Sequence, residues 1–497
     1  MSEATWGSSS ERAKRRGGQA VSERSDVGGV PVSTAAPIRI VTPTGMLGYG
    51  YPEADFWRCV DDGVDAIVVD SGSTDPGPYM LGLGKTLVTE ESYARDLRPM
   101  LRASHERRIP VLISSAGGAG TRAQVDQMVD LIDRLATEDG FALRVASIYG
   151  DIPAATVQRR LAAGQVQPNV RGELPSEQDV VGAEAIVAQM GAEPFRAVLD
   201  SDEPVDVIVA GRAYDPAPHA AVSIKAGVDP AIAWHMGKIL ECGGACCEPK
   251  GGGVVATVHP DTFELTPMTP GHACTPLSVA AHTLYEKSRP DLLVGPAGVL
   301  DISDCSYTAV DERTVRVSGS RFEPSVHPTL KLEGAAIVGY RTTFIGGVRD
   351  PILIGQLDEF LARVVKLVGT MHPDLASGVA HVKFRIYGRN AVMGDLEPST
   401  QIPHEVGILG EVTAPTQEQA TAICTNIRVG VLHLNYPGQI ATAGNFALPL
   451  TPMENPIGPV CAFTLYHVMD AEGLDLFPIS YRHVGTPAHD ASKEMAR

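Results

Sequence analysis

The sequence predicts an α/β protein: a parallel sheet with helices on both faces, followed by a β-rich middle and an α+β C-terminal layer. In the first half, short apolar runs alternate with longer segments whose apolar residues recur at helical spacing, as in parallel strands buried on both faces. After residue 250 the pattern changes to alternating polar and apolar residues, which indicates half-buried strands. Hydrophobic residues make up 44% of the 497 positions and charged residues 20%, so the chain can bury a large core.

Residues 37–250 are predicted to form the α/β domain, and its elements follow one another in a strand–helix rhythm. The expected strands cover residues 38–41, 66–69, 111–113, 143–146 and 205–209. The expected helices cover residues 54–62, 91–108 and 121–137. In the last of these helices the apolar residues recur every three or four positions, at Val125, Met128, Val129, Ile132 and Leu135.

Two further regions and a tail complete the predicted organisation. Residues 251–385 are expected to be β-rich, with clear alternation at 314–317, and residues 386–497 to form an α+β region. A helix at 351–368, a strand at 381–387 and a strand–helix pair over 406–427 are the expected elements of the last third. Residues 1–36 mix Ser, Gly, Arg and Glu without apolar periodicity, which predicts a disordered tail.

Composition excludes several classes of partner. With 41 Lys+Arg against 59 Asp+Glu the formal net charge is −18, which argues against nucleic-acid or anionic-membrane binding. Eight cysteines in so long a chain do not indicate a disulfide scaffold, and only those at 242–247 are clustered along the sequence. We expect a cytoplasmic homo-oligomer whose partner is a small anionic molecule.

Candidate site residues follow the predicted strands, where ligands gather in parallel sheets. Asp70 and Ser71 come after the second strand. A glycine-rich turn after the third strand opens into a helix and offers N–H groups to an anion; its candidate residues are Ser115, Gly117, Gly118 and Thr121. The alternative is a tight strand–helix turn in which Thr121 is the N-cap. Neither this turn nor Gly84-Lys85-Thr86 satisfies a nucleotide-binding motif, so no redox cofactor is expected.

Two more strand ends carry charged residues. Asp151 follows the strand at 143–146, and Arg212 and Asp215 follow the strand at 205–209. An arginine in such a turn can bind a carboxylate with two hydrogen bonds, and a neighbouring carboxylate can orient it or accept a proton. The alternative is that Arg212 and Asp215 pair with each other to fix the loop.

The segment 238–247 combines Lys238, Glu241 and Cys242 with two further cysteines near the end of an expected helix. One C-x₃-C-C group without a second half is a weak indication of a metal site, which His235, His259 and His272 could complete, and buried inert thiols are the expected state. A nucleophilic Cys242 or Cys246 with a histidine is the alternative.

Several motifs in order resemble the acyclic terpene utilisation (AtuA) family. They are QMGAEP at 189–194, VIVAGR at 207–212 with Asp215, GKILECG at 237–243, and the proline- and glycine-containing stretch after 270. The sequence departs from the family pattern at Lys238, where the family usually has His, at 271–275, where the usual TGG turn is interrupted, and at 115–118, where SAGG replaces NAGG. The resemblance covers residues 38 to about 469.

The resemblance implies chemistry on organic acids or acyl-CoA thioesters, for which a lyase or hydratase role has been proposed in the family. We therefore expect a lyase or hydratase that uses general acid/base catalysis. Asp70, Asp151 or Asp215 is the expected base and Lys238 or Glu241 the acid partner, while Arg212, His272 and the glycine-rich turn bind the substrate. A Cys-dependent hydrolase or acyl transferase and a non-catalytic acyl-ligand-binding subunit are the alternatives.

Overall fold

The computed structural model describes residues 36–72, 77–169, 172–284, 289–471 and 475–486. The predicted N-terminal tail lies outside the described residues, except for Ala36. None of the helices in the described part combines the length and the apolar character needed to cross a membrane.

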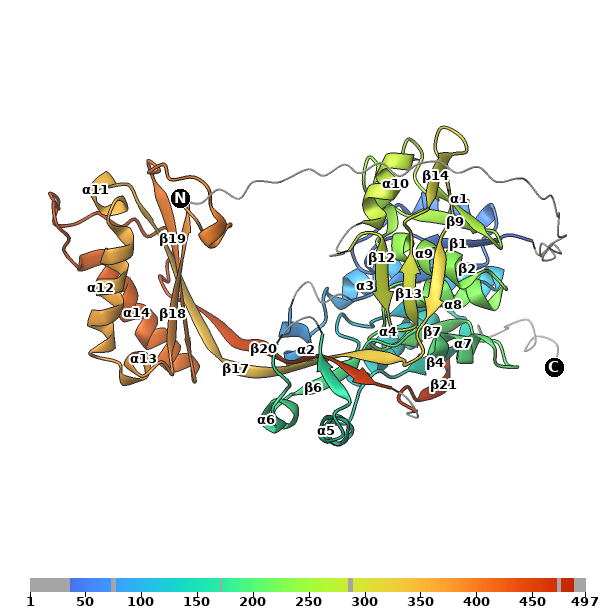
Figure 1. Cartoon of the computed structure of the whole chain (residues 1–497), viewed down its shortest axis with the longest axis horizontal. Coiled ribbons are helices and arrows are strands. Elements are labelled where there is room, and N and C mark those ends of the chain that lie inside the picture. Colours follow the sequence, from blue (N-terminus) through green and yellow to red (C-terminus); the bar gives the residue numbers. More distant parts are fainter. Residues whose placement is uncertain (1–35, 73–76, 170–171, 285–288, 472–474, 487–497) are drawn as a thin grey trace, which may run out of the picture. The chain divides into compact units, whose positions relative to one another are not determined.

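One large mixed sheet organises most of the chain (Figure 1). Its parallel strands lie in the order β1, β2, β3, β7, β4. Their bounds are Ile38–Thr42, Ala66–Asp70, Val111–Ser114, Val207–Ala210 and Ala142–Ile148. All five predicted strands are thus present, within two residues of the expected bounds.

The sheet is not purely parallel, which corrects the predicted architecture. Antiparallel strands from the β-rich middle extend it beyond β1, and the last strand of the chain extends it beyond β4. These strands are β9 (Val254–Val258), β10 (Thr262–Pro267), β15 (Val315–Ser318), β14 (Ser306–Ala309) and β21 (Ile479–Gly485). The short connection between β9 and β10 allows a hairpin, and a hairpin is necessarily antiparallel.

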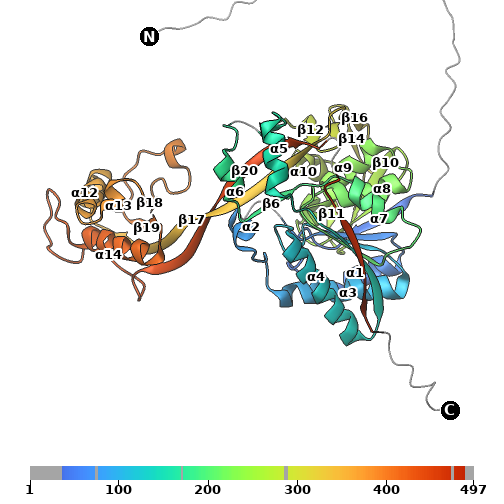
Figure 2. The same cartoon turned by 90° about the horizontal axis from the view of Figure 1, so that it is seen from below.

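Alternate residues of the parallel strands pack with different helices. On β2, Ile67 and Val69 belong to a core with α1, α3 and α4, whereas Ala66 and Val68 belong to another with α8 and α9. The bounds of these helices are Glu53–Asp61, Glu90–Arg107, Arg122–Asp139, Ala217–Lys225 and Pro230–Leu240. Helices α3 and α4 lie side by side in Figure 2. The period-2 alternation of a strand therefore accounts for two cores around one sheet.

A second sheet is built around β17 (Thr329–Val348), which the sequence did not single out as one strand. Its first residues pair with β6 (Ala185–Ala188), and its last nine pair with β19 (Val406–Ala414). Strand β20 (Asn455–Asp470) follows β17 along most of its length, as Figure 1 shows, with three register shifts. The strand β18 (His381–Tyr387) and the helices α12 (Leu357–Gly369) and α14 (Gln417–His433) pack with the β19 end.

The remaining elements are short. The helices are α2 (Tyr79–Leu83), α5 (Ala154–Ala162), α6 (Glu177–Val181), α7 (Glu193–Leu199), η1 (Gly243–Cys246), α10 (Pro276–Thr283), α11 (Pro351–Ile354), α13 (Pro373–Ala376) and η2 (Gly394–Leu396). The strands are β5 (Val166–Pro168), β8 (Cys247–Glu248), β11 (Ala273–Cys274), β12 (Leu292–Gly295), β13 (Gly298–Asp301) and β16 (Arg321–Pro324).

Candidate functional site

Asp70 is the last residue of β2, and its carboxyl group is almost fully buried. The Ser114 hydroxyl, at the end of the neighbouring β3, donates a hydrogen bond to its Oδ1 at 2.7 Å. Burial raises the pKa of Asp70 well above its ordinary value, and the negative charges of Asp215 and Glu241 raise it further. The positive charge of Arg212 and the hydrogen bond from Ser114 lower it, but by less. This carboxyl group therefore keeps a proton at pH values where an exposed aspartate has lost it.

Arg212 follows β7 and is 2% exposed. Its Nη1 donates to Asp215 Oδ1, to Ser115 Oγ and to the Ala213 carbonyl, each at 3.0 Å, and its Nε donates to Glu333 Oε2 at 3.2 Å. The pairing with Asp215, left open as an alternative from the sequence, is present. Most of the N–H groups of Arg212 therefore donate to other residues of the protein, and these hydrogen bonds hold the surrounding loops in place.

Glu333 is a member of this site that the sequence did not reveal. It comes from β17, and its Oε1 also accepts hydrogen bonds from Gln189 and Lys331, each at 3.0 Å. Burial alone would raise the pKa of Glu333, but the charges of Arg212 and Lys331 lower it below its ordinary value. Only the pairing of β17 with β6 brings it within reach of Arg212, and no sequence motif encodes that pairing.

The glycine-rich turn between β3 and α4 is packed backbone against backbone. A Cβ atom on Gly120 would lie 2.2 Å from the Arg212 nitrogen, so only glycine fits there. Ser115 has φ of +50°, an unusual value for a residue with a side chain. The Gly118 and Gly120 N–H groups donate to the Ser115 and Ala116 carbonyls.

The first residues of α4 are also satisfied internally. The Thr121 hydroxyl and the Gln124 side chain form a capping box, and Asp151 Oδ2 accepts from the Arg122 N–H at 2.7 Å. The N-cap interpretation of Thr121 therefore accounts for this turn. Asp151 lies at the start of α4 and makes no ion pair with Arg212 among the described residues. Ser71 is buried beside Tyr93.

Helix α9 supplies a second buried ion pair. Lys238 and Glu241 form a hydrogen-bonded salt bridge, and both are less than 10% exposed. The charge of Glu241 acts on Asp70, and the charges of Glu241 and Asp215, added to burial, raise the pKa of Tyr214. We call Asp70, Arg212, Asp215, Lys238 and Glu241 the charged cluster.

A cavity of about 470 Å³ is lined in part by residues that follow this cluster along the chain, although no member of the cluster is among its lining residues. Its walls are the turn after β1 and the segment after α9, and they include Cys242, which follows Glu241 directly, and Lys250. The other lining residues are Thr44, Gly45, Met46, Tyr49, Leu87, Gly244, Ala245, Gly251 and Gly252. The volume suits a small organic molecule. A Cβ on Gly45 would lie 2.6 Å from the Cys242 carbonyl, so the two walls touch through their backbones.

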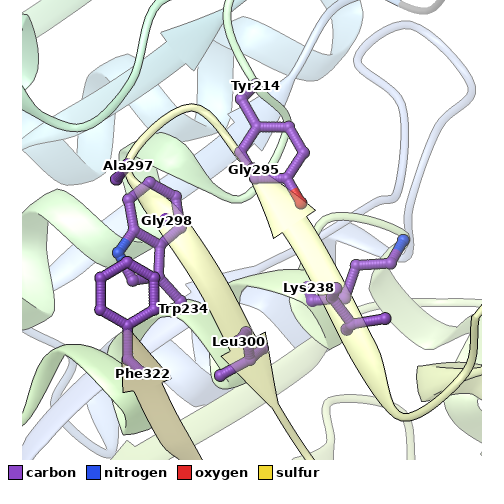
Figure 3. Close-up of a pocket in the computed structure, with 9 residues that line it drawn as sticks. Tyr214, Trp234, Lys238, Gly295, Ala297, Gly298, Leu300 and Phe322 are labelled. Atoms are coloured by element: carbon purple, nitrogen blue, oxygen red, sulfur yellow. The ribbon is translucent and has the colours of Figure 1, made fainter. Parts of the chain in front are cut away.

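Figure 3 shows a second, apolar pocket, which Lys238 helps to line. Trp234 and Phe322 stack there with ring centroids 6.3 Å apart, and Tyr214 and Gly295 close it. It holds only about 10 Å³, about one water molecule. This pocket is therefore a packing feature beside the charged cluster rather than a ligand site.

The three cysteines of the segment 242–247 have different surroundings. Cys242 lines the cavity, whereas the sulfur atoms of Cys246 and Cys247 lie close to that of Cys274, which the sequence did not connect with them. Hydrogen bonds from Cys246 and Cys274 lower the pKa of Cys247 to about 4. The charge of His272 acts on Cys247. The expected part of His272 in substrate binding stays a prediction.

The fold and the site define an α/β protein with a buried charged cluster at the carboxyl ends of its parallel strands. The model of the acyclic terpene utilisation family protein AtuA matches residues 38–450, and the chain belongs to this family. The family resemblance seen in the sequence is thereby confirmed. No curated protein and no solved structure gave a match.

Proposed function

We propose that this protein is a lyase or hydratase that acts on a small carboxylic acid or its CoA thioester by general acid/base catalysis. The observation that carries the proposal is the pKa of Asp70, which is raised by burial and then by the charges of Asp215 and Glu241; Glu241 is itself held in an ion pair with Lys238. Environments that separate the protonation of two neighbouring carboxyl groups are the usual means of providing an acid and a base together.

The cavity supports the choice of substrate. Lys250 gives its wall a positive charge, whereas Lys238, three residues before Glu241, is paired with that carboxylate. Because the net charge of the chain is −18, an anionic substrate is not attracted from a distance, so local positive charge must hold it. In this proposal Asp70 and Glu241 exchange the proton, and Arg212 is a positioning residue that fixes Asp215 and the loops.

Solvent-deuterium exchange tests the proposal directly. Purified protein is incubated in D₂O with a panel of small carboxylic acids and their CoA thioesters, and deuterium at the carbon next to the carbonyl is followed by NMR. We expect exchange with at least one compound, and a fall of roughly 10²- to 10⁴-fold in Asp70→Asn. Asp301→Asn is the matched control, since it makes the same change at the end of β13, at a residue outside the charged cluster that is not a candidate base.

Two results would count against the proposal. Absence of exchange with every compound would remove the lyase or hydratase, and equal losses in both variants would remove the special role of Asp70. Ligand binding without any turnover would favour the non-catalytic acyl-binding alternative.

One observation favours a second candidate, a Cys-dependent hydrolase or acyl transferase. Cys242 alone among the cysteines of its segment lines the cavity. Substrate should then protect Cys242 from iodoacetamide, and Cys242→Ser should abolish thioester cleavage while leaving the fold intact. Undiminished cleavage in Cys242→Ser would exclude this candidate.

A further inference from the structure

Three thiols from separate short elements lie close together, next to the segment that lines the cavity. Cys246 ends η1, Cys247 begins β8 and Cys274 ends β11. The two strands pair antiparallel with Cys247 directly opposite Cys274. All three side chains are buried, and their sulfur atoms lie within 4.8 Å of one another. None of them is part of the charged cluster.

The spacing of the sulfur atoms fits a tetrahedral metal. Two thiolates bound to one zinc ion at about 2.3 Å lie about 3.8 Å apart when the coordination is tetrahedral. The Cys247 and Cys274 sulfur atoms are 3.8 Å apart. The strand pairing alone therefore sets two of the ligands at the required separation.

A histidine lies near the thiols, although neither of its ring nitrogens is within 4.8 Å of all three sulfur atoms. His272 lies two residues before Cys274 and within electrostatic range of Cys247. Its Nδ1 is buried and makes no hydrogen bond to any residue that the structure describes. An imidazole nitrogen of this kind either loses a hydrogen bond on folding or binds something else.

We propose that Cys246, Cys247 and Cys274 bind one zinc ion and that the His272 side chain turns toward them to supply the fourth ligand. Three thiolates and one imidazole are the ligand types that zinc prefers, and a buried set of four ligands is characteristic of a structural site. Each coordinating thiol releases its proton to solvent as the zinc–sulfur bond forms, and no oxidation is involved.

The ion would fix one wall of the cavity. Gly244 and Ala245 of η1 line the cavity, and Cys246 follows them directly. The Ser278 hydroxyl of α10 donates to the Cys246 carbonyl at 2.7 Å, which holds the same turn from the other side. Zinc would therefore tie the segment after α9 to β11 and α10, whatever reaction the cavity serves.

Metal analysis of the untagged protein, grown with zinc and purified under reducing conditions, tests the proposal. We expect about one zinc per chain, and a loss of at least about ten-fold in Cys247→Ser, in Cys274→Ser and in His272→Ala. Cys424→Ser is the matched control because Cys424 is equally buried but lies on α14; it should retain zinc. His282→Ala should also retain it, and loss of zinc there instead would overturn His272 as the fourth ligand.

Two measurements on the unaltered chain guard against variants that fail to fold. Replacing zinc by Co²⁺ should produce the absorption of thiolate-to-cobalt charge transfer, and thiol titration of unfolded, chelator-treated protein should find all eight cysteines reduced. Six thiols would indicate a disulfide and overturn the proposal. Eight thiols with no uptake of added Zn²⁺, or copper or iron found in place of zinc, would overturn it as well.

Discussion

Asp70 is 4% exposed, so at the residue scale its protonation depends on burial more than on any single neighbour. Its pKa in the folded chain lies above the ordinary 3.8, so the folded state binds more protons than the unfolded state between these two values. The contribution of Asp70 to the stability of the wild-type protein should therefore fall as pH rises through this window and then level off.

Asp70→Asn removes this titration while it keeps a partner for Ser114. We expect the unfolding free energy of the variant, relative to wild type, to increase from about pH 4 upward and to reach a plateau above the folded-state pKa. Urea unfolding at a series of pH values measures it. Asp179→Asn should give the opposite slope at acid pH, since hydrogen bonds from Ser176 lower the pKa of Asp179. A difference that does not vary with pH would contradict the assignment.

The substitution Glu333→Gln tests whether the buried Arg212 depends on this carboxylate partner. Glu333→Gln leaves a buried guanidinium with one carboxylate partner fewer, and we expect a loss of about 3 kcal/mol in unfolding free energy. Glu323→Gln on the exposed face of β16 is the control and should change stability by less than about 0.5 kcal/mol. Similar values for the two variants in urea unfolding would show that Arg212 does not depend on Glu333.

The sequence located all five members of the charged cluster because they lie at the ends of strands or of a helix. Asp70 ends β2, Arg212 and Asp215 lie in the turn after β7, and Lys238 and Glu241 are three residues apart at the end of α9. Glu333 and Cys274 could not be found in this way. They join their partners through strand pairing across 121 and 27 positions, which no local pattern reports.

At the element scale, the turn between β3 and α4 needs glycine at residue 120, because the backbone of Arg212 lies too close for a side chain. Gly120 and Gly84 have similar positive φ values, +68° and +61°, but only Gly120 lies against another backbone. Alanine at either position incurs the left-handed strain of about 1 kcal/mol. Gly120→Ala should in addition displace Arg212, so we expect a loss of at least about 3 kcal/mol against about 1 kcal/mol for Gly84→Ala.

Thermal unfolding of both glycine variants, with deuterium exchange as a second readout, checks this expectation. Equal destabilisation would mean that the turn relaxes without disturbing Arg212. A larger effect at Gly120 together with reduced exchange would link the packing of this turn to the charged cluster.

Long strands were the elements hardest to predict. The alternation of β17 is interrupted by Gly334 and Gly339, where its pairing with β20 also shifts register. A period-2 pattern loses its phase at each such shift, so the sequence indicated a β-rich region without its 20-residue strand. Compact strand–helix units with unbroken apolar runs, by contrast, were predicted within two residues.

At the scale of the whole molecule, the large sheet is completed by a strand that lies outside the matched family segment. The family model ends at residue 450, yet β21 pairs with β4 over seven residues, from Ile479 opposite Ile148 to Gly485 opposite Ala142. Val484 is 1% exposed and packs into the core that contains α3 and α4. The last described strand is therefore part of the sheet whose other edge carries the β-rich middle.

Val484→Asp tests whether this strand is needed for the stability of the sheet. An unpaired carboxylate in that core should lower the unfolding free energy by about 3 kcal/mol or more, and the exposed edge of β4 should promote aggregation. His483→Asp is the matched control, because the neighbouring residue points to solvent on the same strand. Urea unfolding and analytical ultracentrifugation measure the two effects. If Val484→Asp behaves like His483→Asp, β21 is dispensable for the stability of the large sheet. If only Val484→Asp is destabilised, the folding unit extends beyond the family match, because the edge of β4 must be covered before the core beneath it is complete.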